Sequence, residues 1–351
     1  MGQWYATRED VLSALDFKAT SRDAAQLDQH LETGARAVDD LTHRRFYPQT
    51  RTQYYEWPTG LSPVRYRLWV DGPAQLVSLD SLTSAGVPIT AEGYFLEPAN
   101  DGPPFNRIEL DRGGSAAFSG GATSQRSVAA HGVWGYDDVR KPATSLSGSL
   151  GASTTATTVR VADGSRVGVG SLITVGTERM TLTERALVDS GVTITADLTD
   201  KAAANVITLS SAVGAPLAGE TIAIDGETMV VAYTTNSGAR LVVRRSWDGS
   251  PLAAHTSGAA VLVGRSFTAE RAALGSSVAA HADGAAVEAQ VYPGPVVDVN
   301  IAEAVVAYLN RSSGYARTSG SGDNERETAS RGLAEARKRL LAYKRVRTAA
   351  V

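Results

Sequence analysis

The strongest candidates for acid–base or metal chemistry in this chain are its five histidines, His30, His43, His131, His255 and His281. His255 and His281 stand out because they occupy the same position in two copies of a sequence repeat. Such a pair predicts either a metal or catalytic site, or two rings that each stabilise their own turn by hydrogen bonds. The chain has no cysteine, and no neighbouring histidine or carboxylate pair completes a set of metal ligands. We therefore expect both rings to have a structural role.

Two glutamates, Glu178 and Glu227, also occupy equivalent positions in a repeat. Paired carboxylates can carry out glycoside hydrolysis when they face one another across a substrate. Both residues lie beside a predicted hairpin turn, and we expect both side chains to face solvent. The sequence also lacks a Gly-Lys-Ser/Thr loop, a Gly-x-Ser-x-Gly elbow and a His-Glu-x-x-His helix. We therefore predict no catalytic, cofactor-binding or metal-binding residue, and we expect that the chain is not an enzyme.

These candidates lie in a β-rich region that contains internal repeats. Residues 172–180 resemble residues 221–229, and each copy has the pattern of a strand, a tight turn and a return strand. Residues 245–261 recur as residues 271–287 with ten identities in seventeen positions, which is too many to expect by chance. The copies are too few and too uneven for a solenoid. Duplicated β-hairpins within one compact domain are the better interpretation.

Strand patterns extend over the whole middle of the chain. Alternating residues and turn signals predict a first β module over residues 50–142. Residues 143–155 are rich in Ser, Thr and Gly, which is typical of a linker or loop. The second predicted β module, residues 143–295, contains the hairpin repeats.

Both ends of the chain have helical patterns. Thr7 with Asp10, and Asn300 with Glu303, match the spacing of helix caps. Short amphipathic helices cannot bury their apolar stripes singly, so we predict one helical domain from residues 1–49 and 296–351. The stripe residues expected to pack the helices together or to dock on a partner are Leu27, Leu31, Val38, Leu41, Leu333, Leu340 and Tyr343.

The charges of the chain are unevenly distributed. A formal net charge of -3 gives no overall attraction to nucleic acid or anionic lipid. From residue 324 onward, however, eight Lys and Arg residues stand against three Glu residues, so this end is basic. This basic segment predicts a solvated helical face, or a surface that contacts DNA phosphates or an acidic partner. The cations concerned are Arg337, Lys338, Arg339, Lys344, Arg345 and Arg347. No stretch approaches the roughly 20 apolar residues of a membrane span, so we expect no membrane association.

The order of these features resembles that of the head-to-tail adaptor (connector) proteins of long-tailed bacteriophages, especially those of actinobacterial hosts. Four passages carry the likeness, and no single one of them is specific. The first is the N-terminal helix pair, which starts at Tyr5 to Val11 and ends at Arg44 to Pro48, and the second is Arg107 to Leu110 followed by Gly132 to Tyr136. The third is the Asp225-Gly226-Glu227 hairpin with the repeats after it, and the fourth is the C-terminal helix pair that ends at Tyr343-Lys344-Arg345.

The resemblance implies an α+β fold in which a small helical domain, built from both chain ends, carries a long β-rich insertion of one or two barrel-like or sandwich-like modules. It implies a virion structural protein that forms a homo-oligomeric ring, usually a dodecamer, around the DNA channel at the head–tail junction. Assembly would take place in the cytoplasm of the host bacterium. The implied partners are further copies of the chain, the portal protein, a downstream stopper or tail-terminator protein, and the passing double-stranded DNA. The alternatives are another tail component, such as a terminator, baseplate or fibre part, and a carbohydrate-binding or hydrolytic β protein.

Overall fold

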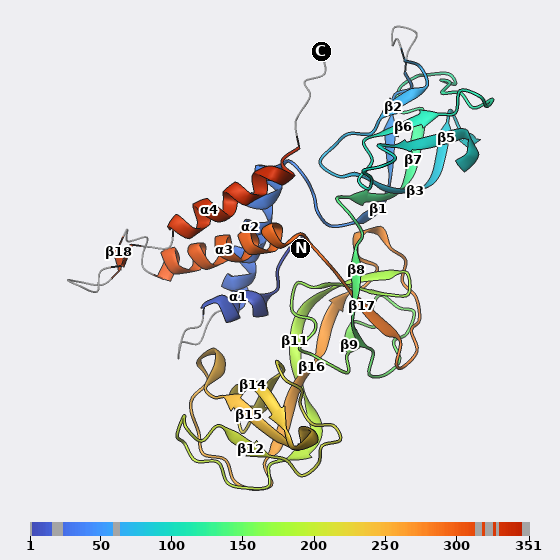
Figure 1. Cartoon of the computed structure of the whole chain (residues 1–351). Helices are drawn as coiled ribbons and strands as arrows, with labels where there is room; N and C mark the ends of the chain where they lie inside the picture. Colours follow the sequence, from blue (N-terminus) through green and yellow to red (C-terminus); the bar gives the residue numbers. More distant parts are fainter. Residues whose placement is uncertain are drawn as a thin grey trace.

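The computed structural model describes residues 2–15, 24–58, 64–312, 318–319, 326–327 and 330–345. Four α-helices lie in these ranges, and all of them come from the two chain ends (Figure 1). They are α1 (Arg8–Leu15), α2 (Ala24–Thr42), α3 (Gly294–Ser312) and α4 (Ser330–Leu340). Between them the chain is almost entirely β, which confirms the predicted α+β class.

The four helices form one domain because their apolar stripes face a shared interior. Helix α2 lies along α3, and a methyl group on Gly34 of α2 would come within 3.0 Å of the Asn300 backbone oxygen. A glycine at this position therefore lets the two helices approach closely. Val38, one turn further along α2, is buried beside Val299 of α3 and Leu340 of α4. The domain thus contains residues from both ends of the sequence.

Helix α3 begins earlier than the sequence predicts. It starts at Gly294, with Pro295 in its first turn, where a missing backbone N–H costs nothing. Asn300 consequently lies inside the helix and is fully buried, so the predicted Asn300–Glu303 cap is wrong. A buried amide in mid-helix needs partners from other elements, and Asn300 finds them.

The first β module consists of two sheets that enclose one core. Its four-stranded sheet has the order β1-β7-β3-β4, and its three-stranded sheet has the order β2-β6-β5. All the pairs are antiparallel, and Trp134 and Ile108 contribute fully buried side chains from the two sheets. The strands are β1 (Gln49–Tyr55), β2 (Arg67–Trp69), β3 (Gln75–Ser84), β4 (Val87–Ile89), β5 (Tyr94–Glu97), β6 (Arg107–Leu110) and β7 (Val128–Gly135).

The rest of the β-rich region is a single antiparallel ten-stranded sheet. Its order is β12-β15-β14-β13-β16-β11-β10-β17-β8, with β9 paired to β16. The strands are β8 (Arg140–Ser145), β9 (Thr158–Arg160), β10 (Leu172–Val175), β11 (Glu178–Thr193), β12 (Val206–Thr208), β13 (Thr221–Ile224), β14 (Glu227–Thr235), β15 (Arg240–Arg244), β16 (Ala260–Glu270) and β17 (Ala286–Gln290). Residues 143–145 of the predicted linker or loop belong to β8, and residues 146–155 form a loop. This loop packs into a hydrophobic core of the sheet through the buried Leu146 and Leu150, so it is not a linker between modules.

Two separate hydrophobic cores divide this sheet into two repeats, one inserted into the other. We call residues 140–185 and 265–290 the outer repeat, and residues 186–264 the inner repeat. The long strands β11 and β16 pair along their length and run from one repeat into the other. The chain therefore enters the outer repeat, builds the whole inner repeat, and returns. In Figure 1 the inner repeat and the first β module lie at opposite ends of the molecule.

Polar contacts join the units to one another. The side chain of Arg179 in the outer repeat donates to Thr50 Oγ1 (2.8 Å) and pairs with Asp138 (3.0 Å) beside the first module. At the C-terminal end, Arg345 Nη1 pairs with Asp71 of the first module at 2.7 Å. These contacts fix the helical domain and the outer repeat against the first module.

Candidate functional site

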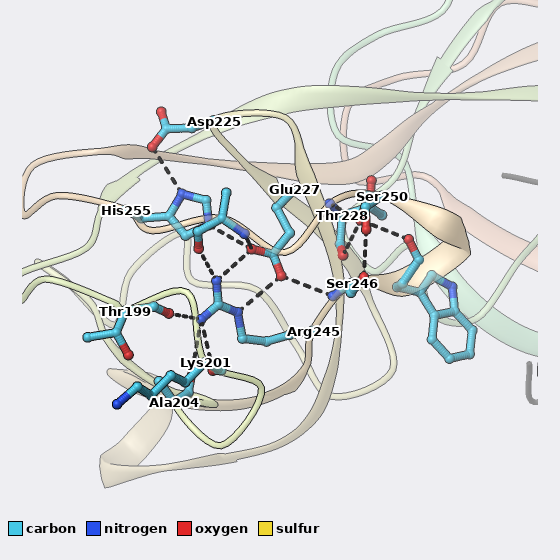
Figure 2. Close-up of polar contacts among 12 residues, drawn as sticks. Thr199, Lys201, Ala204, Asp225, Glu227, Thr228, Arg245, Ser246, Ser250 and His255 are labelled. Carbon is cyan, nitrogen blue, oxygen red and sulfur yellow. Dashed lines mark hydrogen bonds and ion pairs between the residues drawn. The ribbon is translucent and has the colours of Figure 1, made fainter. Parts of the chain in front are cut away.

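Glu227 is the centre of a buried polar cluster in the inner repeat (Figure 2). It begins β14 directly after a tight turn, and its side chain is fully buried. Arg245, the residue after β15, donates to its two carboxylate oxygens through Nε (3.0 Å) and Nη2 (2.6 Å). The backbone N–H groups of Ser246 and Ala253 donate to the same carboxylate at 2.9 and 3.0 Å. The Nε2 atom of His255 lies 3.0 Å from it. One carboxylate thus gathers five donors from two short segments, residues 245–246 and 253–255.

The guanidinium of Arg245 connects this cluster to a loop. Its Nη1 atom donates to the backbone carbonyl oxygens of Thr199, Lys201 and Ala204. Carbonyl oxygens in a loop have no ladder partner of their own, so a buried arginine is an effective donor for them. The cluster therefore fixes the path of this loop.

The outer repeat contains the same cluster around Glu178. Arg271 donates to this carboxylate through Nε (2.7 Å) and Nη2 (2.8 Å), and the Nε2 atom of His281 lies 2.8 Å away. The backbone N–H groups of Ala272 and Ala279 donate at 3.0 and 2.9 Å. Arg271 also donates to three loop carbonyl oxygens, as Arg245 does. Each histidine ring therefore forms a hydrogen bond within its own repeat, and its partner is the glutamate of that repeat.

The expectation that Glu178 and Glu227 face solvent is wrong, because both side chains are fully buried. Burial alone would raise the pKa of each carboxyl. The hydrogen bonds from the arginine, the backbone N–H groups and the histidine outweigh burial, and they lower the pKa of Glu178 and of Glu227 to about 2. Each glutamate is therefore ionised at neutral pH with its oxygens occupied by donors. A carboxylate held in this way is a structural anion and a poor general acid or base.

The two clusters differ in one side-chain contact. In the inner repeat, Nδ1 of His255 lies 3.1 Å from Asp225, whereas the equivalent residue of the outer repeat is Gly176. Both nitrogens of the His255 ring therefore face carboxylates. Among the described residues, no group of three or more His, Asp or Glu side chains is arranged to hold a metal ion.

A second polar centre joins the two chain ends, and the sequence did not identify it. Asn300 Oδ1 accepts hydrogen bonds from the backbone N–H groups of Tyr5 (2.9 Å) and Ala6 (3.1 Å). Its Nδ2 donates to the backbone oxygen of Leu31 at 2.9 Å. One side chain of α3 therefore holds both the N-terminal segment and α2. The sequence feature that could have indicated this polar centre is an asparagine within an otherwise apolar helical stripe.

The Tyr5 hydroxyl forms another link within this domain. It donates to Asp39 Oδ1 of α2 at 2.5 Å and accepts a hydrogen bond from the Phe46 backbone N–H at 3.2 Å. Burial raises the pKa of Asp39 to about 6, although the Tyr5 hydroxyl and Arg36 act in the opposite direction. This carboxyl therefore titrates near neutral pH.

Most of the predicted interface residues are buried between helices of this same chain. Leu27 and Leu31 are buried in one helical core, and Val38 and Leu340 are buried in a second. Leu333 is also buried, and Tyr343 packs edge-on to Phe46. Leu41 does not belong to this set, because 36% of its surface is exposed at the edge of α2.

Three of the predicted basic residues form ion pairs, and two of these three, Arg337 and Lys338, are nevertheless exposed. Arg337 pairs with Glu303 at 2.6 Å, Lys338 with Glu335 at 3.1 Å, and Arg345 with Asp71 at 2.7 Å. Arg339 and Lys344 are exposed. Arg347 lies outside the described residues. The paired arginines connect elements of this chain, so the surface left for a partner is smaller than the sequence predicted.

A cavity of about 660 Å³ lies where the N-terminal segment meets the two repeats. Its polar lining connects these units. Arg8 lines the cavity and pairs with Asp28 of α2 at 2.5 Å within the helical domain. Between the units, Arg185 of the outer repeat lies 3.3 Å from Glu9 of α1. Glu9 also accepts from the Val169 backbone N–H at 2.8 Å. These groups hold the helical domain on the outer repeat.

Comparison with protein-family models, curated proteins and solved structures gives no match for this chain. None of the described helices combines the length and apolar character needed to cross a bilayer.

Proposed function

We propose that this protein is a structural component of a phage virion, which forms a homo-oligomeric ring at the head–tail junction. The observation that carries the proposal is the helical domain built from both chain ends, with the whole β-rich region inserted between its second and third helices. This arrangement agrees with the expectation that the adaptor resemblance gave. The ring would surround the DNA channel and bridge the portal protein to the next connector protein of the tail.

The contacts of the helical domain are consistent with a rigid docking unit. Asn300 binds the backbone of two other segments, and the two cores between the helices contain residues from both termini. The Glu–Arg–His clusters and the contacts of Arg179 and Arg345 add rigidity to the β-rich units and to the joints between them. A protein that transmits load between head and tail needs such fixed joints more than it needs a reactive centre.

The exposed cations of the C-terminal helix provide a surface for a charged partner. Arg339 of α4 and Lys344, which follows this helix, are exposed, and Lys338 pairs with Glu335 one turn away on the same helix. We propose that this surface faces an acidic patch of a neighbouring protein or the phosphates of the passing DNA. Because exposed cations act through screened electrostatics, either contact would weaken steeply with salt.

Imaging of phage particles tests the proposal directly. A gold-labelled antibody against the inner repeat should mark a ring at the neck of intact particles, and the purified chain should form closed rings under the electron microscope. Label confined to the capsid shell, the tail tube or the fibres would overturn the head–tail assignment. For the charged surface, the Arg339→Glu/Lys344→Glu variant should lose any low-salt affinity for duplex DNA, and the exposed Gln29→Glu variant is the control.

A further inference from the structure

The outer surface of the three-stranded sheet, which we call the aromatic face, exposes two large rings. The register pairs Trp69 with Arg107, and Phe95 with Glu109, so these four residues lie on the same side of the sheet. The opposite side carries buried residues such as Ile108. Trp69 and Phe95 each leave 56% of their surface exposed. They stand at diagonal corners of this face, separated by the central strand β6 (Figure 1).

The charges on the aromatic face neutralise one another. Glu109 accepts from Arg67 and from Arg107, both at 2.7 Å, and Arg107 also lies 3.6 Å from Glu97. The Arg107 guanidinium is 5.6 Å from the centre of the Trp69 ring. Two cations and two anions thus form one ion chain that holds the arginine side chains in place. A fixed surface of tryptophan, phenylalanine and arginine has the composition of a protein-binding hot spot. A neutral surface favours a neutral, apolar occupant.

The inner repeat presents such an occupant in the segment that we call the inner loop, residues 211–219. This segment contains no charged residue. Val213 leaves 85% of its surface exposed and Leu217 leaves 43%. Exposed aliphatic side chains are common singly, whereas the inner loop exposes two of them within one uncharged segment.

In the outer repeat, the loop equivalent to the inner loop is covered by the helical domain. Backbone hydrogen bonds match residues 217–220 to residues 168–171: Gly219 N donates to Val231 O at 2.7 Å as Gly170 N donates to Leu182 O at 2.7 Å. In the outer repeat this loop is an interface. Val169 is buried in the core of the helical domain, and Gly170 lies directly against the ring of Trp4. The loop therefore accepts a tryptophan within the chain.

The inner loop cannot be covered in this way by the same chain. The N-terminal segment that carries Trp4 is already seated on the outer repeat, where Gln3 also donates to Gly170 O at 2.9 Å. The aromatic face lies at the opposite end of the molecule from the inner repeat (Figure 1). A contact between the inner loop and the aromatic face therefore requires two molecules.

We propose that the inner loop of one copy docks on the aromatic face of the next copy, with Val213 and Leu217 packed against Trp69 and Phe95. This inference rests on the proposed ring and names a contact between its subunits. The two surfaces differ, so the contact is heterologous and leaves one free surface of each kind on every dimer. Such a contact propagates head to tail, and it gives a closed ring where the rotation between neighbouring subunits closes.

Two variants that each destroy one surface test the head-to-tail geometry. Val213→Glu places a charge on the inner loop, and Phe95→Glu places one on the aromatic face. Each variant alone should self-associate at least about tenfold more weakly than the wild type, because an unpaired carboxylate would be buried in an apolar contact. A 1:1 mixture should form dimers and nothing larger, since each dimer uses the two intact surfaces. The control is Val139→Glu, an exposed valine outside both surfaces. Mass photometry of the full chain provides the readout, and circular dichroism checks folding.

Cross-linking provides a second test that does not depend on a strong assembly. The chain has no cysteine of its own, so engineered cysteines react without background. Single-cysteine variants at 213 or 217 are mixed with single-cysteine variants at 69 or 95 and treated with a short bis-maleimide. At least one of the four pairs should give a covalent dimer above the level of a Val139→Cys control.

The outcomes separate this contact from the proposed function. If Val213→Glu and Phe95→Glu assemble like the wild type, or if no pair cross-links above the control, the docking contact is wrong. Rings that persist in both glutamate variants overturn the contact and leave the neck ring standing. Cross-links between the single-cysteine variants, together with a wild-type chain that forms only open filaments, support the contact and contradict the closed ring.

Discussion

The helical domain gives a sharp test of the claim that both chain ends form one unit. Replacing Asn300 by alanine removes an acceptor from the N–H groups of Tyr5 and Ala6 and a donor from Leu31 O. Asn300 is fully buried, so water cannot replace these partners without opening the domain. Each buried N–H left without an acceptor costs about 1–3 kcal/mol, so the two together cost about 2–6 kcal/mol.

Hydrogen exchange measured by mass spectrometry resolves this loss region by region. Because about 1.4 kcal/mol corresponds to a factor of ten, amides of α2 and α3 should exchange at least about thirtyfold faster in Asn300→Ala. The inner repeat, which has its own core, should keep its wild-type rates. The control variant is Gln29→Ala on the exposed side of α2. Faster exchange confined to α3, with α2 and the N-terminal segment unaffected, would refute the claim that Asn300 couples the chain ends.

The further predictions concern buried charged residues and a salt bridge between two units of the chain. Glu227→Gln should destabilise the inner repeat by about 3–5 kcal/mol, because Arg245 loses its anion, and Glu178→Gln should do the same in the outer repeat. Amide hydrogen exchange that speeds up in the repeat without the substitution would contradict this. Folding lowers the pKa of Glu178 and Glu227 from 4.5 to about 2, so this stabilisation is present above pH 4.5 and is lost as the pH falls towards 2. Folding raises the pKa of Asp39 from 3.8 to about 6, so its contribution to the free energy of unfolding is present below pH 3.8 and is lost as the pH rises through 6. In Asp39→Asn, the free energy of unfolding of the helical domain should no longer show this dependence on pH. Arg345→Ala should release the C-terminal end from Asp71 and speed its proteolysis, whereas Lys344→Ala, with an exposed side chain, should not.

The apolar patterns of the sequence predicted much of the fold. The stripe of Leu27, Leu31 and Val38 has helical spacing, and the structure buries all three residues between helices. The repeats were visible because the two copies of the Glu–Arg–His cluster need the same residues at the same positions. Local periodicity carries this information, since the residues that share one face of an element are fixed by its geometry.

Long-range contacts account for what the sequence did not predict. Glu178 and Glu227 were expected in solvent because each follows a hairpin turn. Both are buried against an arginine from another strand end, which is 93 residues away for Glu178 and 18 residues away for Glu227. Asn300 matched a helix cap in sequence, yet it binds Tyr5 and Ala6, nearly the whole chain away. No local pattern contains such pairings.

The sequence by itself determined that the ends of this protein are helical, that its middle is β-rich, and that parts of the middle are duplicated. Only the tertiary structure decided that one repeat is inserted within the other, because that depends on the pairing of β11 with β16. It also decided which apolar side chains remain exposed. Trp69 lies between Leu68 and Val70 in the sequence, yet its ring is exposed on the aromatic face, whereas Trp4 is covered by the outer repeat. Burial depends on the neighbours that folding supplies, and the sequence around a residue does not contain them.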